Sequence, residues 1–113
     1  MQSNRSVAEL LLHLGITPNY SGFFQTVLAV HLALRDLERL TCVTKSLYTE
    51  VANSYGISWK AVERNIRTVV SIAWDCNRPL LEQLSRRPLP DKPKPSQFLA
   101  LLTAYYSVEK PLR

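Results

Sequence analysis

The stretch LYTEVANSYGISWKAVERNIRTVVSIAW, residues 47–74, predicts a short helix, a turn at residues 56–58 and a long second helix. Gly56 suits the position just past a helix end, where a positive φ is needed. Ser58 suits the N-cap of the next helix, because its hydroxyl can accept from a free backbone N–H. This layout is that of a helix-turn-helix, whose second helix can lie in a DNA major groove. Apolar residues at helical spacing are expected to face the core: Leu47, Val51, Ala52 and Tyr55 before the turn, and Val62, Ile66, Val69, Val70 and Ala73 after it.

The opposite face of the second helix carries charged residues suited to reading DNA bases. Lys60 and Arg64 are four residues apart, so they project from neighbouring turns of one face. Arg64 can bond to both O6 and N7 of guanine, and Glu63 can accept from the amino group of cytosine. Lys60 can reach a base edge or a phosphate. We therefore predict base contacts from Lys60, Glu63 and Arg64.

Phosphate contacts are predicted on both sides of these residues. Arg67 and Thr68 lie further along the helix, and the helix N-terminus at Ser58 and Trp59 can offer backbone N–H groups. For the Trp59 side chain, we favour packing under the turn over a contact with the sugar-phosphate backbone. The alternative for the whole face is an ordinary solvated surface, in which Glu63 and Arg67 form an i,i+4 ion pair.

Helical periodicity runs through nearly the whole chain of 113 residues, and no run alternates as a strand would. We predict one all-α domain, residues 1–113, in the form of a six-helix, bundle-like fold. The expected helices run from Ser6 to Leu14 with Gly15 as the stop, from Ser21 or Gly22 to about Leu40, through the helix-turn-helix at about 45–76 with Asn77 as a left-handed stop, from Pro79 to Ser85, and over about 96–108 with Ser96 as the N-cap.

The segment RRPLPDKPKP, residues 86–95, is called the strap below. It holds four of the seven prolines and four basic residues, so it cannot be helical. We expect an extended, solvated arm that follows the DNA backbone. The predicted phosphate contacts in it are Arg86, Arg87, Lys92 and Lys94. The alternative is a linker whose charges keep it in solution.

Charge and composition narrow the function further. The net charge is +5, and the excess lies in residues 60–67 and 78–94, as expected of a phosphate-binding face, although a mildly basic surface is the alternative. Glycines are isolated, and no cysteine or histidine has a partner at ligand spacing. We therefore predict no enzyme activity, no metal, no cofactor and no small-molecule substrate. An apolar run long enough for a membrane span or typical of a signal peptide is missing, so a cytoplasmic protein is expected.

The same stretch resembles the C-terminal effector domain of the stage zero sporulation protein A family, a response regulator of endospore-forming bacteria. The matching pieces are Leu47-Tyr48, Val51-Ala52, Val62-Glu63-Arg64, Ile66-Arg67 and Ala73-Trp74, and KPKPSQFLALL at residues 92–102 is similar to the family's last helix. The resemblance implies a six-helix domain that binds a short promoter box in double-stranded DNA. It also implies a homodimer on tandem sites through the last helix, for which we predict contacts from Phe98, Leu102, Tyr105 and Tyr106.

Two departures from the family pattern bear on function. Ala61 and Thr68 stand where the family usually has arginine and histidine, so a shifted sequence preference is expected. A receiver domain is absent from these residues, which fits either an excised effector domain or a stand-alone form. We predict a sequence-specific transcriptional regulator of the sporulation-effector type. The alternative is a protein-interaction module that pairs with or antagonises a full-length regulator without specific DNA binding.

Overall fold

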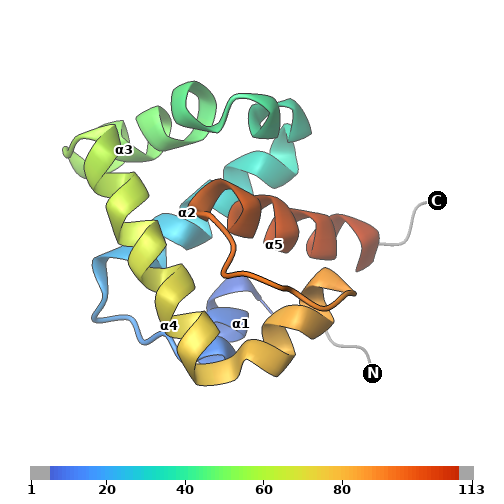
Figure 1. Cartoon of the computed structure of the whole chain (residues 1–113). Coiled ribbons are helices and arrows are strands. Elements are labelled where there is room, and N and C mark those ends of the chain that lie inside the picture. The colour runs from blue at the N-terminus through green and yellow to red at the C-terminus, as the bar shows by residue number, and fades with distance from the viewer. Residues whose placement is uncertain (1–5, 110–113) are drawn as a thin grey trace.

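The computed structural model describes residues 6–109, with side chains described to residue 107. Within this range the chain is helical and contains no strand, which confirms the all-α prediction (Figure 1). The elements are α1 (Val7–Leu14), α2 (Ser21–Arg35), a 3₁₀ helix (Leu37–Thr41), a π-helical turn (Thr44–Tyr48), α3 (Thr49–Tyr55), α4 (Trp59–Ser85) and α5 (Pro95–Glu109).

The core lies where α2 packs against α4, α5 and α1. Gly22 lets α2 approach α4 closely, because a Cβ atom at this position would collide with the backbone oxygen of Asn65. Beside it the buried side chain of Gln25 accepts a hydrogen bond from the Asn65 amide (3.1 Å). α4 is therefore held against the centre of the domain along its first half.

Phe98 and Leu102 of α5 are completely buried in this core. Their predicted role as dimer contacts was wrong, because the periodic apolar face of α5 packs on α2 and α4 within one chain. Tyr105 and Tyr106, which are half-buried, are the residues of that prediction that reach the surface.

The first helix has the predicted boundaries. Ser6 and Glu9 form a reciprocal capping box, and Gly15 ends the helix with a φ of 103°. The second helix is shorter than predicted and ends at Arg35 rather than near Leu40. Asp36 is extended, with a φ of −153°, and its carboxylate accepts from the Glu38 N–H (3.2 Å). An aspartate thus caps the following 3₁₀ helix where the apolar stripe alone predicted a continuing α-helix.

Asn77 divides α4 into two parts but is not left-handed as predicted. Its backbone is non-helical (φ −155°, ψ 59°), and its side-chain oxygen accepts from the Leu80 N–H (3.3 Å). Its amide donates to the His13 carbonyl (2.9 Å), which joins the break to α1. Asn77 therefore acts as an N-cap for the second part, with Pro79 in the first turn as expected. In the prediction of six helices, these two parts of α4 were two separate helices.

The strap is packed against the domain, so the prediction of a solvated arm was wrong. Leu89, 7% exposed, donates its N–H to Glu82 Oε2 (2.8 Å) and accepts from Arg78 Nη2 at its carbonyl (2.8 Å). Pro93 is buried as well. The last strap residue, Pro95, begins α5, so Ser96 is not the N-cap. Proline is suited to a first helical position, because its missing N–H would have no helical partner there.

Candidate nucleic-acid interface

The turn between α3 and α4 has the predicted geometry. Gly56 has a φ of 68°, and the N–H groups of Gly56 and Ile57 both donate to the Ala52 carbonyl. The Ser58 hydroxyl accepts from the Ala61 N–H (3.1 Å) and caps α4. Nine residues were predicted to face the core, and all are buried except Tyr55. Tyr55 is 44% exposed because it ends α3 beside the exposed turn.

The outer face of α4 presents Lys60 and Arg64, both exposed. Neither forms an ion pair within residues 6–109. The Lys60 ammonium lies 5.8 Å from the ring centroid of Trp59, which is 38% exposed and therefore does not pack fully under the turn. Two cations and an aromatic ring thus face solvent at the start of α4.

Thr68 follows Arg64 by one turn and is also exposed. Its hydroxyl donates to the Arg64 carbonyl (3.2 Å). To donate to a phosphate, this hydroxyl must first give up that internal hydrogen bond, which weakens its predicted role.

Glu63 and Arg67 lie on the edge of α4 that faces the strap. Arg67 Nη2 is 3.4 Å from Glu63 Oε2, so the two form the i,i+4 pair that was the alternative for this face. Behind them Tyr48 is buried, and its pKa is raised to about 12 by burial first and by the negative charge of Glu63 second, while Arg67 acts in the opposite direction. For Glu63 to accept from a cytosine, it must compete with Arg67 for the same carboxylate.

A groove of about 830 Å³, called the flank groove below, runs beside this edge of α4. It brings Arg67 together with Lys92 and Lys94 of the strap, although these residues are far apart in the sequence. The Lys92 ammonium donates to the Ser71 hydroxyl (3.1 Å). Three cations and one carboxylate, that of Glu63, line the groove, so its net charge favours a phosphate.

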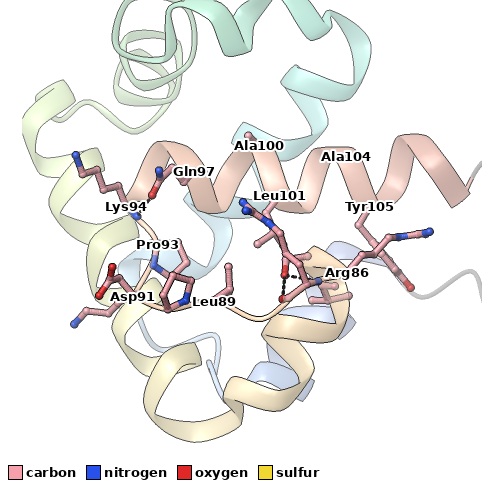
Figure 2. A pocket seen from close by; sticks show the side chains of 15 residues that line it. Arg86, Leu89, Asp91, Pro93, Lys94, Gln97, Ala100, Leu101, Ala104 and Tyr105 are labelled. Carbon is pink, nitrogen blue, oxygen red and sulfur yellow. Dashed lines mark hydrogen bonds between the residues drawn. The ribbon is translucent and has the colours of Figure 1, made fainter.

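Arg86 and Arg87 lie at the other end of the strap and do not line the flank groove. Figure 2 shows Arg86 near Tyr105, away from Lys94. Two of the four strap cations predicted to contact phosphates, Lys92 and Lys94, therefore line the flank groove.

Sequence reasoning missed the groove residues Ser71 and Tyr48. Ser71 stands four residues after Arg67, and this helical spacing could have placed it on the same edge. Tyr48 was noted only as part of a family motif. Its contact with the Glu63 edge depends on the π-helical turn before α3, for which the sequence carries no clear signal.

A helix-turn-helix with an exposed basic face on its second helix is the architecture of a DNA-binding regulatory protein. Residues 7–106 match the family described as "Sporulation initiation factor Spo0A C terminal", and the chain belongs to this family. The family is a DNA-binding regulatory domain of sporulation rather than an enzyme family, which confirms the resemblance seen in the sequence. In the part of the chain that the structure describes, no helix has both the length and the apolar character of a membrane span.

Proposed function

We propose that this chain binds double-stranded DNA at specific sequences through α4 and regulates sporulation genes from the cytoplasm. The main support for this proposal is that Lys60 and Arg64 project from the outer face of α4 without ion-pair partners among the described residues. Their charges are therefore available to a ligand, unlike that of Arg67. An α-helix fits the major groove of B-form DNA, where base edges differ between all four base pairs.

Arg64 is the principal base-reading residue in this proposal. Its guanidinium can donate to O6 and N7 of one guanine in a fixed, planar arrangement. Lys60, one turn earlier, reaches a neighbouring base or phosphate. Glu63 contacts a cytosine only if Arg67 turns from the Glu63 carboxylate to a DNA phosphate. DNA binding then replaces the Glu63–Arg67 ion pair with one between Arg67 and the phosphate.

The flank groove supports a phosphate contact beside the major groove. Arg67, Lys92 and Lys94 converge there from α4 and the strap, and positive side chains at this position fix the register of a helix on DNA. The capped N-terminus of α4 at Ser58, with Trp59 next to it, offers a second phosphate contact. Arg86 and Arg87 have no such geometric support.

Ala61 leaves the DNA-facing surface of α4 with one long side chain fewer than the family usually has. It is half-buried at the edge of the outer face, so no long side chain extends from this position. We expect a preferred sequence that differs at the base pair which an arginine there would contact. Binding as a homodimer on tandem sites, with Tyr105 and Tyr106 at the contact, is part of the same proposal.

The test is selection of duplexes from a random pool, followed by titration of the selected and a scrambled duplex over a salt series. We expect a specificity ratio of about 10³ or more, the lower end for specific DNA binders, and a salt dependence that reports several phosphate contacts. Analytical ultracentrifugation of the protein bound to duplexes with one binding site and with two adjacent sites measures dimer formation. Equal binding to both duplexes would contradict sequence reading, and no binding at low salt would favour a protein-interaction module.

A further inference from the structure

A second cavity, of about 690 Å³, lies between the strap and α5 (Figure 2). Its size is within the range of small-molecule sites, which are typically about 300–1,000 Å³. None of the proposed base-reading residues lines it. Lys92 and Lys94, however, line both this cavity and the flank groove, so the cavity shares its lysines with the proposed phosphate contact.

The floor of the cavity is apolar. Leu84, Leu89 and Leu101 form it, and Tyr105 lies at one end. Ala100 and Ala104 stand on successive turns of α5, and their small side chains leave the space open. An apolar group of ring size or a short acyl chain can be buried here, and burial of such a group favours binding.

The rim of the cavity is basic. It carries four cationic residues and one carboxylate, that of Asp91, so the local net charge is positive. The cations come from both ends of the strap, as Figure 2 shows for Arg86 near Tyr105 and Lys94 near Gln97. The Lys92 ammonium is hydrogen-bonded to Ser71 in the flank groove, so the strap arginines supply the positive charge at the Tyr105 end of the cavity. The four cations are Arg86, Arg87, Lys92 and Lys94.

We propose that this cavity binds a small amphipathic anion, with one apolar body and one carboxylate, sulfonate or phosphate group. The apolar body lies on Leu89 and Leu101 between the two alanines. The anionic group lies at the rim, beside Arg86 and Arg87. A few polar groups around an apolar floor are typical of small-ligand sites.

Fluorescence titration of the full chain with 8-anilinonaphthalene-1-sulfonate tests the proposal. N-phenyl-1-naphthylamine, which has the same rings but no sulfonate, is the matched probe. We expect saturable binding of one sulfonate probe per chain, and binding of the neutral probe weaker by about tenfold, or 1.4 kcal/mol. Decanoate should displace the sulfonate probe, whereas decyltrimethylammonium should not. Equal affinity for both probes, or binding that does not saturate, would overturn the proposal.

Variants locate the site. Ala104→Leu places a larger side chain into the cavity from an exposed position, so it should weaken probe binding about tenfold or more without unfolding the domain. Ala104→Ser keeps the volume and should bind as the wild type does. Arg87→Gln should weaken the sulfonate probe about threefold and leave the neutral probe unchanged.

Arg35→Gln is the matched charge control, because Arg35 is exposed on α2 and lines neither cavity. Thermal melts of each variant confirm that the domain stays folded. Unchanged binding by Ala104→Leu, or equal losses for Arg35→Gln and Arg87→Gln, would show that the probe binds elsewhere and would overturn the assignment.

Discussion

Two basic segments of this chain, the first half of α4 and the strap, look equally suited to DNA in the sequence, but they are built differently. The first half of α4 is a regular helix fixed by fully buried Val62, Ile66 and Val69. The strap has no regular structure before Pro95, and the second half of α4 fixes it through hydrogen bonds from Arg78 and to Glu82.

This difference decides where the charges point. On α4 the apolar face turns inward, so Lys60 and Arg64 must point outward together. The strap has no such period: all four of its cations line the cavity beside α5, and Lys92 and Lys94 line the flank groove as well. The cations of α4 therefore share one outward surface, whereas those of the strap border two different hollows.

The largest expected effect tests whether packing alone fixes the first half of α4. Ile66→Ala removes a completely buried side chain between helices and should lower the free energy of unfolding by about 2–5 kcal/mol. Leu89→Ala, the matched change in the strap, should lower it less, because an irregular segment can close over the space. Urea denaturation measures both. Equal losses would show that the strap is packed as rigidly as α4.

The second prediction tests the hydrogen bonds that fix the strap. Glu82→Ala leaves the Leu89 N–H without its acceptor and should cost about 1–3 kcal/mol of unfolding free energy. Glu82→Gln keeps an acceptor oxygen and should restore part of the loss. Hydrogen exchange at the Leu89 amide provides the local measurement. If Glu82→Ala left this amide as protected as in the wild type, the strap would be fixed by other contacts.

Features of the fold that depend on residues close together in the sequence could be predicted, whereas those that depend on distant residues could not. Gly56 and Ser58 act on their own backbone, and the apolar period of α4 acts within one helix, so the helix-turn-helix was predicted correctly from the sequence. The end of α2 was predicted wrongly, although Asp36 is also a local capping signal, because the apolar stripe continues past it. At a helix end, a capping side chain such as Asp36 decides the boundary even where the apolar pattern continues.

The packing of the strap could not be predicted from its own sequence. Its prolines exclude a helix correctly, but they do not say whether the segment packs. That depends on Glu82 and Arg78, which precede the strap by several residues and meet it only in the folded chain. For the same reason, the sequence placed Arg67 on the DNA-facing surface but could not show that it shares a groove with Lys92.

The third prediction separates two arginines on α4. Arg64→Ala should weaken binding to the selected duplex by about 1–3 kcal/mol and relax the sequence preference. Arg67→Ala, the matched change at a residue paired with Glu63, should weaken selected and scrambled duplexes alike and reduce the salt slope by about one. Titrations over a salt series measure both. If Arg64→Ala weakened both duplexes equally, its base-reading role would be wrong.

The smallest effect concerns the backbone where α4 meets the strap. Arg86 has a φ of 64°, the left-handed conformation that favours glycine, and it is the one non-glycine residue with a positive φ in the described range. Arg86→Gly should therefore stabilise the domain by about 1 kcal/mol, seen as a rise in Tm of about 4 °C or more.

Arg87→Gly is the matched control for this backbone effect. It removes the same charge at a position without a positive φ, so it should destabilise the domain slightly, because glycine gains freedom in the unfolded chain. If both glycine variants were equally stabilised, relief of charge repulsion in the strap would be the cause rather than the backbone conformation of Arg86. The sign of the difference between the two thus tells whether the junction is strained by its backbone or by its charge.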